Sequence, residues 1–329
     1  MGARQFLVRM VTSFLHNQNQ CVSLTQDEAS EFQEIWCGAP QGTKLGPLIF
    51  LIVFNPVLAH IQSRYKFADD LSSISFRTLA SLAEEITTSS IFSQLKHNLE
   101  DVMLTVSETK SHILRVSFLK SAIPSQEDTG LATKDEIKIL GVILKSNLKW
   151  DPHIQSILQK ASLCLKSFAC LTRFNIQISI MRSLYCMYVR SQTEYACPVW
   201  HPGLTATQTE KLENIQKRAC QIMLGANYTS YEDSLQKLRL QKLSERRHDL
   251  TMRFGKKCLS SDVHRKILPD FQESQISWPK TRRGALTSSC QLLCPPPRKA
   301  SKRYLSSFVP YFVNHYNEEL VEMEIYKKL

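Results

Sequence analysis

A change of residue pattern near Trp150 constrains the fold of this chain more than any other feature of its sequence. Before Trp150, short alternating apolar runs that are typical of strands occur between helical stretches and polar turns. After it the strand pattern stops, and apolar residues recur at helical spacing at about 154–172, 178–195 and 207–224. The pattern predicts an α+β chain, in which a part with an antiparallel sheet and helices is followed by an all-α part.

The expected domain boundaries follow from this change and from a stretch rich in Pro, Ser and Arg after residue 269. We expect a first domain over residues 1–150, a helical domain over 151–268, and a basic linker and C-terminal tail over 269–329. A basic helical region at about 236–258 lies inside the helical domain.

The elements of the first domain can be predicted from their periodicity. One hairpin is expected at Tyr65–Phe76 around an Asp69-Asp70 turn, and a second over Ile137–Trp150 with its turn at Ser146-Asn147. A helix is expected to begin after the turn-like segment Gly38–Thr43. The remaining elements are helices at 5–15 and 81–104 and strand-like runs at 20–24, 32–37 and 106–118.

The charge of the chain points to a polyanionic partner. Of its 329 residues 43% are hydrophobic, the formal net charge is +11, and from Glu210 onward 22 Lys and Arg stand against 13 Asp and Glu. Nucleic-acid backbones and anionic membrane surfaces both attract such an excess. We expect no membrane partner, because the longest apolar run, at 45–61, is interrupted by Asn55 and His60 and no long amphipathic helix has a basic rim.

The ten cysteines are expected to be reduced. Most stand singly inside apolar patterns, and residues 1–10 lack the apolar run of a secretory signal. The sequence therefore predicts an intracellular protein, nuclear or cytoplasmic. Cys290 and Cys294 form a C-x₃-C pair without a second pair, so a zinc site, which needs about four ligands, is not expected.

Asp69 and Asp70 are the candidate catalytic residues. Two adjacent carboxylates on a strand turn are hard oxygen ligands that suit Mg²⁺. In a two-metal site for phosphoryl transfer the ions lie about 3.5–4 Å apart and stabilise the attacking and the leaving oxygen. The alternative is a solvated turn, since Asp is a common turn residue. An isolated pair favours the turn, and only its sequence context can favour the metal site.

That context consists of further motifs in a fixed order. The chain contains GAPQGTKLGPLIF, then FADD, SETKS, LGVILKSNLKWDPH, LYCMYVRSQTEYACPVWHPGL, LENIQKRACQIMLG and KRYLSSFVPYFVNHYN. In these motifs, which span nearly the whole chain, it resembles the reverse transcriptases of non-LTR retrotransposons, particularly the jockey-like group. The resemblance implies an RNA-directed DNA polymerase, a nucleotidyltransferase of a transposable element, with a palm, an all-α thumb and a basic tail.

The resemblance also implies roles for single residues. Asp69 and Asp70 are expected to be the catalytic carboxylates that bind Mg²⁺. Gln41 and Gly42 match the start of the helix that shapes the pocket for the template base and the incoming nucleotide. Lys110 matches the lysine near the triphosphate, and its alternative is a plain exposed lysine.

The second hairpin and the basic helical region are the expected nucleic-acid contacts. Leu140, Gly141 and Trp150 match the hairpin that grips the primer end, where Gly141 permits close approach of the strand. The alternative for Gly141 is a β-bulge, and the alternative for the basic residues is solvated surface. The candidates for contacts to the nucleic-acid backbone are Arg246, Arg247, Arg253, Lys256 and Lys257.

One part of the family pattern has no match in this chain. Family polymerases have a further aspartate, in a segment resembling F-x-x-D-x-x-x-A-F-D, upstream of the helix that here begins near Gln5, and their fingers precede it. We therefore expect an N-terminally truncated, partial palm that is inactive alone and works with another chain that supplies the missing palm and fingers. Its partners are an RNA template and a DNA primer. The alternative function is a non-catalytic, nucleic-acid-binding remnant of a mobile element.

One helix of the all-α part should lie in its core, because its apolar residues recur on one face. The expected stripe consists of Leu212, Ile215, Ala219, Ile222 and Met223. A short break at Pro202-Gly203 favours an antiparallel neighbour, so we expect the stripe to pack on Leu184, Tyr188 and Trp200.

Overall fold

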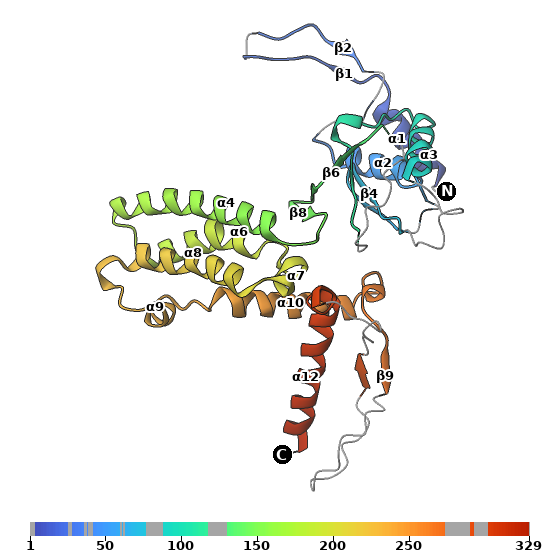
Figure 1. The fold of residues 1–329 in the computed structure, drawn as a ribbon. Coiled ribbons are helices and arrows are strands. Elements are labelled where there is room, and N and C mark those ends of the chain that lie inside the picture. Colours follow the sequence, from blue (N-terminus) through green and yellow to red (C-terminus); the bar gives the residue numbers. More distant parts are fainter. Residues whose placement is uncertain are drawn as a thin grey trace. The chain divides into compact units, whose positions relative to one another are not determined.

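The computed structural model divides the chain into two compact units. The first unit is Met1–Ile113 with Leu119–Thr133, and the second is Leu114–Phe118 with Lys134–Leu329. The residues that the structure describes are 4–25, 28–35, 38, 42–59, 61, 63–76, 88–117, 130–273, 290–292 and 302–328. Helices and short sheets occur together, which confirms the α+β class, and Figure 1 shows the elements.

The first unit combines helices with two-stranded sheets. The strands pair as β1 with β2, β3 with β4, and β5 with β6, so its described strands do not form the single sheet expected of a palm. These strands are short, with two to four residues each. In chain order the elements are α1 (Gln5–Leu15), β1 (Asn19–Gln20), β2 (Gln33–Glu34), α2 (Leu45–Phe54), β3 (Arg64–Phe67), β4 (Asp70–Ser73), α3 (Thr88–Glu100), a 3₁₀ turn (Glu108–Lys110), β5 (His112–Leu114) and β6 (Ala132–Lys134).

The core of the first unit lies between α2, the turn that follows it, and α3. Val57 and Leu58 follow α2 and are 2% and 0% exposed, and they pack with Ile91 and Leu99 of α3. Helix α1 has the predicted bounds, but none of its residues is buried. Its apolar face is only partly covered, because Val11 and Phe14 are half-buried while Phe6 is 74% exposed.

The second unit begins with a hairpin and continues as a helical bundle. Figure 1 shows α4, α8 and α10 lying along one another and α12 running across the end of α10. Its elements are β7 (Glu136–Ile139), β8 (Val142–Lys145), α4 (Asp151–Cys170), a 3₁₀ turn (Leu171–Phe174), α5 (Ile178–Leu184), a π-helical segment (Tyr185–Arg190), α6 (Ser191–Glu194), α7 (Cys197–Trp200), a 3₁₀ turn (His201–Gly203), α8 (Ala206–Leu224), a 3₁₀ turn (Gly225–Asn227), α9 (Tyr231–Leu238), α10 (Leu243–Leu259), a 3₁₀ turn (Arg265–Ile267), β9 (Phe271–Glu273), β10 (Cys290–Leu292), α11 (Lys302–Leu305) and α12 (Phe308–Lys328).

Local polar contacts explain where several of these helices begin. Thr205 and Gln208 form a reciprocal capping box at the start of α8, and the Ser230 hydroxyl accepts from the Asp233 N–H at the start of α9. Helix α10 has no such cap of its own. Instead the Glu213 carboxylate of α8 accepts from the N–H groups of Leu243, at 3.0 Å, and Ser244, at 3.3 Å. A negative charge at a helix N-terminus is favourable, so this contact fixes α10 against α8.

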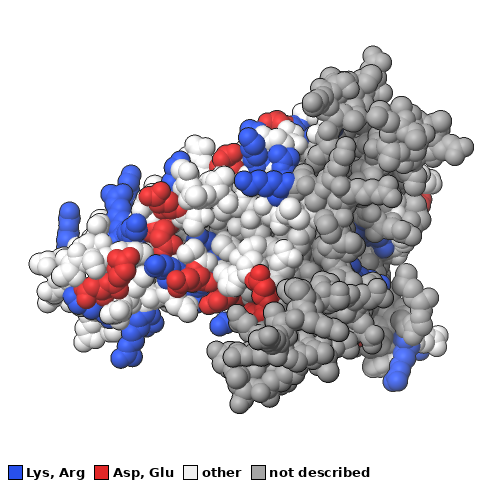
Figure 2. Space-filling view, turned by 60° about the horizontal axis from the view of Figure 1, so that its bottom comes forward, with Lys and Arg blue, Asp and Glu red and all other residues white. Residues whose placement is uncertain are grey.

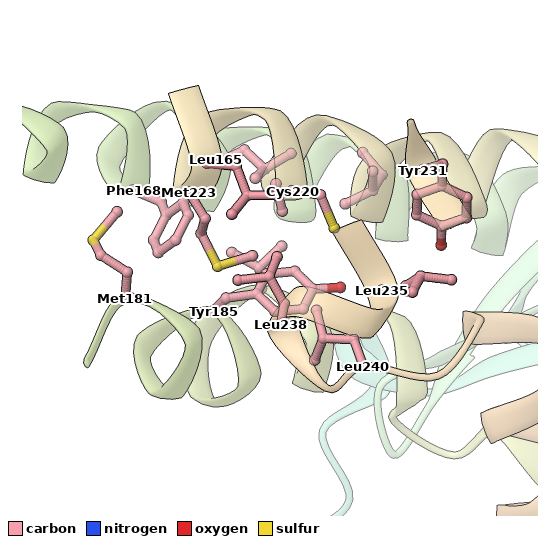
Figure 3. Packing of buried hydrophobic residues seen from close by; sticks show 14 of the residues in the cluster. Leu165, Phe168, Met181, Tyr185, Cys220, Met223, Tyr231, Leu235, Leu238 and Leu240 are labelled. Carbon is pink, nitrogen blue, oxygen red and sulfur yellow. The ribbon is translucent and has the colours of Figure 1, made fainter. Parts of the chain in front are cut away.

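The predicted stripe of α8 lies in the core of the bundle. Leu212, Ile215, Ala219 and Met223 are at most 8% exposed, and Ile222 is partly buried. Figure 3 shows side chains of α4, α5, α8 and α9 converging in the largest cluster.

The predicted partners of the stripe are correct only in part. Trp200 is fully buried in one cluster with Leu212, and Leu184 packs at the edge of the main cluster. Tyr188 is 60% exposed, so its predicted contact is wrong. The cause is the π-helical segment, which widens the helical repeat. The buried face consequently follows every fourth residue, at Met181, Tyr185, Val189, Thr193 and Cys197.

The hairpin β7–β8 turns six residues earlier than predicted. Ile139 pairs with Val142, so Leu140 and Gly141 form the two-residue turn, with φ of 46° and 87°. Two successive positive φ values match the twist of the strands and favour glycine at one position. The predicted turn at Ser146-Asn147 lies beyond β8, where the Lys149 N–H donates to Asn147 Oδ1 at 2.9 Å on the way into α4.

Helix α12, in the predicted tail, packs on α10. Phe312 and Val313 are 0% and 2% exposed and lie in one cluster with Met252 and Cys258 of α10. Gly255 of α10 leaves the room that the Phe312 ring occupies.

The seven cysteines whose side chains the structure describes are all free thiols, as predicted. Cys197, Cys220 and Cys258 are buried, whereas Cys170 is exposed. Burial raises the pKa of the Cys197 thiol to about 12, so this thiol stays protonated at neutral pH.

Candidate functional site

Asp69 and Asp70 lie at the tip of the β3–β4 hairpin. Phe67 pairs with Asp70, so the two turn residues are Ala68 and Asp69, and Asp70 is the first residue of β4. The predicted hairpin is confirmed, with its turn one residue earlier than expected. Both aspartates are exposed, so a metal ion from solvent can reach their carboxylates.

Two basic residues of β3 anchor this hairpin to the end of α2. Arg64 Nη1 donates to the carbonyls of Asn55, at 3.0 Å, and of Val57. Lys66 Nζ donates to the carbonyls of Phe54, at 2.5 Å, and Asn55, at 3.0 Å. The last carbonyls of a helix have no helical partner and carry a partial negative charge, so the two cations stabilise this end.

The environment of Lys66 lowers its basicity without removing its charge. Burial, and secondly the nearby Arg64 charge, lower the pKa of Lys66 to about 8. The ammonium lies 4.6 Å from the centroid of the Phe54 ring and is still mostly protonated at pH 7. The position of Asp69 therefore depends on a strand that is fixed by backbone contacts of α2.

The other predicted nucleotide contacts lie in the same unit, and those that the structure describes form no hydrogen bond or ion pair with the aspartates. Gly42 is exposed with φ of 77°, and the Thr43 hydroxyl accepts from the Gly46 N–H at 3.1 Å where α2 begins. Lys110 is exposed in the 3₁₀ turn before β5. Gln41 lies outside the described residues.

The donor set at Asp69 and Asp70 fits a hard cation but is small. Carboxylate oxygens are the ligands that Mg²⁺ prefers. Among the residues that the structure describes, no three side chains of His, Cys, Asp or Glu are grouped so that they could hold a metal ion. The described part of the chain therefore contributes two adjacent carboxylates to such a site.

The predicted primer contacts lie in the second unit, on the hairpin that packs on the helices. Leu140 and Gly141 form its turn, and Leu140 is 45% exposed. A Cβ atom on Gly141 would lie 3.1 Å from Cε1 of Tyr195, so the glycine is required by the turn and by this ring. Trp150 precedes α4 and is partly buried, because its indole packs against Gly203 and the His153 ring.

Two hydrogen bonds dock the hairpin onto the bundle. The Tyr195 hydroxyl donates to the Leu140 carbonyl at 2.7 Å, and the Ile143 N–H donates to His153 Nδ1 at 3.3 Å. The hairpin and the helices therefore belong to one unit, as the division of the chain also shows.

One of the five basic residues predicted to contact the backbone of nucleic acid is buried, and that expectation is wrong in this structure. Arg247 is 0% exposed, with its guanidinium 5.8 Å from the centroid of the Trp200 ring. Burial lowers the pKa of Arg247, while the charge of Glu213, among others, acts in the opposite direction. A buried guanidinium cannot reach a phosphate on the surface.

The other four basic residues of this group are accessible to different degrees. Arg246 pairs with Glu194 at 2.5 Å and Lys256 with Glu319 at 2.6 Å, whereas Arg253 and Lys257 are exposed. On the part of the face that Figure 2 shows in colour, Lys and Arg side chains stand among Asp and Glu side chains.

A hollow between the hairpin and the bundle contains residues that the sequence interpretation did not assign. It measures about 230 Å³ and lies beside the β7–β8 turn, α4 and α6. His153 lines it and is 3% exposed, and burial, followed by the Lys160 charge, lowers the pKa of His153 to about 4. The motif WDPH already contains this histidine. The lining residues are Gly141, His153, Ser156, Ile157, Lys160, Ser191, Gln192 and Tyr195.

The first part of the chain is similar to one protein family. Residues 3–144 match the model of the family Reverse transcriptase (RNA-dependent DNA polymerase). The matched segment runs from the start of α1 into β8, so it includes both Asp69 and the docked hairpin. No curated protein and no solved structure matches the chain. None of the helices in the described residues is long and apolar enough to cross a membrane.

Proposed function

We propose that this chain acts in RNA-directed DNA synthesis by a non-LTR retrotransposon of the jockey-like group. The observation that carries the proposal is the exposed Asp69–Asp70 tip, which lies inside the segment that matches the reverse transcriptase family. The motif order GAPQGT, FADD and LGVIL supports the subgroup.

In this function the two aspartates hold Mg²⁺, which supplies positive charge to the reacting phosphoryl oxygens. Asp69 is the metal ligand in the turn, and Asp70 is the second carboxylate at the start of β4. Arg64 and Lys66 keep the hairpin at the end of α2 and so fix where the carboxylates lie. Lys110, Gln41 and Gly42 are proposed contacts of the incoming nucleotide.

The helical unit is the proposed thumb, and its hairpin turn at Leu140-Gly141 is the proposed primer contact. Trp150 supports this contact from behind, because it packs on the bundle beside His153. The exposed cations Arg253 and Lys257, with the partly paired Arg246 and Lys256, are the proposed contacts to backbone phosphates.

We expect the chain alone to bind a template–primer without extending it. Two carboxylates leave a two-metal site short of charged oxygen ligands, and no third acidic side chain stands with them among the described residues. A partner chain that supplies further palm and finger residues would complete the site. The alternative function is nucleic-acid binding without any catalytic role.

Metal binding at the hairpin separates these functions. We would titrate Mn²⁺, as a spin probe for Mg²⁺, into the full chain and its variants Asp69→Asn and Asp101→Asn, the latter removing an exposed carboxylate after α3. The expected result is a Mn²⁺ site that is lost in Asp69→Asn and kept in Asp101→Asn. Equal Mn²⁺ binding by all three proteins would contradict the assigned site and favour the non-catalytic function.

Primer extension is the second measurement. We expect no incorporation of dNTPs on a primed RNA with Mg²⁺ or Mn²⁺. Incorporation that Asp69→Ala abolishes would confirm the polymerase and refute the expectation that the chain is inactive alone.

A further inference from the structure

A cluster of histidine and tyrosine side chains closes the contact between α12 and the rest of the helical unit. Tyr311 of α12 lies at its centre, where α12 meets α7 and α10 (Figure 1). Three imidazole rings contact it, at centroid distances of 5.8 Å for His201, 5.9 Å for His248 and 4.2 Å for His315. Histidine is the side chain whose charge changes near neutral pH, so the docking of α12 should depend on the protonation of this cluster.

The three histidines differ in how their hydrogen bonds respond to a proton. His315 Nδ1 donates to the Tyr311 carbonyl at 2.8 Å, because a carbonyl oxygen can only accept, and a protonated ring keeps this bond. His248 Nδ1 and the Tyr311 hydroxyl lie 2.8 Å apart, and the hydroxyl can accept as well as donate, so this bond also survives protonation. His201 Nδ1 is buried and has no hydrogen-bond partner among the described residues. A proton on this atom would be a buried donor without an acceptor.

The charges around His201 also oppose a proton on its ring. The groups that act on it are Arg247 of α10 and the other two histidines of the cluster, all of which carry or can gain a positive charge. Burial, followed by the Arg247 charge, lowers the pKa of His201 to about 4. His248 differs, because three carboxylates of α10 and α12 oppose the effect of burial and of the His315 charge on its pKa, those of Asp249, Glu319 and Glu318. His201 is therefore the member of the cluster that is least able to hold a proton while α12 is docked.

We propose that His201 is a pH switch for the docking of α12, which stays packed on α10 while the ring is neutral and separates when the ring is protonated. A proton on the docked ring places a second cation near the buried guanidinium of α10, together with a donor that has no acceptor. Separation of α12 removes Tyr311 from the ring and lets water reach it. It also exposes Phe312, which is fully buried in the docked state, and breaks the ion pair between Lys256 and Glu319.

The pH range of the switch follows from the sign of the pKa change. The pKa of His201 in the docked state lies below the value near 6.5 of a ring in water, so docking is strongest above about pH 6.5 and weakens as the pH falls toward 4. With a pKa of about 6.5 after separation, the ratio of separated to docked α12 rises about thirtyfold from pH 7.5 to pH 5.

Hydrogen exchange of the full chain measures this ratio in peptides of α12, after correction for the intrinsic exchange rate at each pH. For the wild type we expect the opening of α12 to increase about thirtyfold from pH 7.5 to pH 5, and to exceed the increase in α8. His201→Phe keeps an aromatic ring beside Tyr311 but cannot be protonated, so its α12 peptides should open equally at both pH values. His201→Gln is also uncharged and should remove the pH dependence too, which provides a second variant if the phenyl ring is not accommodated.

Two further variants serve as controls. His264→Gln removes an exposed imidazole of the same unit, outside the cluster, and its α12 peptides should respond to pH as those of the wild type do. His248→Gln removes the cluster histidine on which carboxylates act, and most of the pH dependence should remain. Peptides of α8, which lies in the core of the bundle, show whether the whole unit opens together with α12.

Three results would overturn the proposal. Opening of α12 that is independent of pH in the wild type, or that increases equally in the wild type and in both His201 variants, would exclude His201 as the switch. Loss of the pH dependence in His248→Gln alone would assign the switch to His248 instead. An equal increase of opening for α8 and α12 would show that the unit unfolds as a whole and does not release α12 by itself.

Discussion

Substitution of Gly255 by alanine tests whether α12 is packed on α10 as the structure shows. Gly255 lies in the interior of α10 and is buried, and the Phe312 ring of α12 occupies the space beside its Cα. An alanine Cβ would lie 2.1 Å from Cδ2, 2.3 Å from Cε2 and 2.6 Å from Cγ of that ring. Carbon atoms in favourable contact lie about 3.5–4.0 Å apart, so the ring would have to move by more than about 1 Å.

Two effects of opposite sign compete in this variant. Alanine is favoured over glycine in a helix interior by about 1 kcal/mol, which alone would stabilise α10. Overpacking of a core costs about 1–3 kcal/mol, and Phe312 cannot swing away because it is fully buried and stacked between Phe308, at 6.1 Å, and Tyr316, at 5.3 Å. Displacing the ring also forfeits part of the roughly 3–5 kcal/mol that a buried phenylalanine contributes. We expect Gly255→Ala to destabilise the α10–α12 contact by about 1–3 kcal/mol.

The sign of the effect should reverse when the ring is removed. In a Phe312→Ala background the clash is absent, so Gly255→Ala should stabilise α10 by about 1 kcal/mol through helix propensity alone. Because the chain has two units, global unfolding is not a clean measure, and the assay is hydrogen exchange of α10 and α12 peptides in the full chain. Arg253→Ala, an exposed change two residues earlier, is the control and should alter protection by less than about 0.5 kcal/mol. Equal stabilisation by Gly255→Ala in both backgrounds would refute the packing of α12 on α10.

Three further predictions concern the same unit. Ile215→Asp should abolish the hydrogen-exchange protection of α8, while the β3–β4 hairpin keeps its protection. The substitution places a charge in the core and loses about 1.5–3 kcal/mol of the free energy gained by burying the isoleucine. Retained protection of α8 would contradict this prediction. Gly141→Ala should weaken the exchange protection of β7 and β8 by about 1–2 kcal/mol, because φ at this position is 87° and the new Cβ would lie 3.1 Å from the Tyr195 ring. Unchanged protection would show that the turn tolerates a side chain. Burial lowers the pKa of both His153 and His201 to about 4, below the unfolded value near 6.5, so the stability of this unit should be full above about pH 6.5 and fall as the pH drops toward 4. Equal exchange protection of α4 peptides at pH 7.5 and pH 5, after correction for the intrinsic exchange rate, would disprove this.

Helix positions could be predicted from the sequence because apolar periodicity reports burial on one face. The predicted helix at 5–15 has the observed bounds of α1, and the stripe that contains Leu212 and Ile215 is buried as expected. Which neighbour each helix meets could not be predicted. The π-helical segment Tyr185–Arg190 shifts the inward face from Tyr188 to Val189, and periodicity at the ordinary spacing contains no signal for it.

Turn positions were predicted less well than strands, because the turn depends on the backbone conformation of individual residues. The hairpin over 137–150 was expected to turn at Ser146-Asn147, two residues of common turn types. The structure turns at Leu140-Gly141, where leucine has φ of 46°. The Tyr195 hydroxyl, 55 residues away in sequence, donates to the Leu140 carbonyl and so stabilises this turn by a tertiary contact. A contact of that sequence separation leaves no local pattern.

The candidate site shows the same division between pattern and packing. The Asp69–Asp70 hairpin was predictable because strand residues flank a turn that is rich in acid, and the structure forms it. The anchoring of that hairpin was not predictable, since Arg64 and Lys66 look like ordinary polar residues of a strand until the end of α2 lies beside them. The residue types indicated carboxylates that could bind a metal ion, and only the structure shows the contacts that hold the hairpin at the end of α2.

Arg247 shows why a count of basic residues overestimates a nucleic-acid surface. It stands in the polar run Glu245–His248, and residue type alone predicts exposure for it. Its position every fourth residue along α10 with Leu243, Thr251 and Gly255 instead puts it on the buried face. A buried charge needs compensation. The Trp200 ring and the charges of Glu213 and Glu194 supply only part of it, because burial still lowers the pKa of Arg247 and its three guanidinium nitrogens have no hydrogen-bond partner among the described residues. Only lysines and arginines outside the buried face of α10 can therefore contact a phosphate. Among the described residues of α10, Arg253 and Lys257 are exposed and form no ion pair, whereas Arg246 and Lys256 are paired.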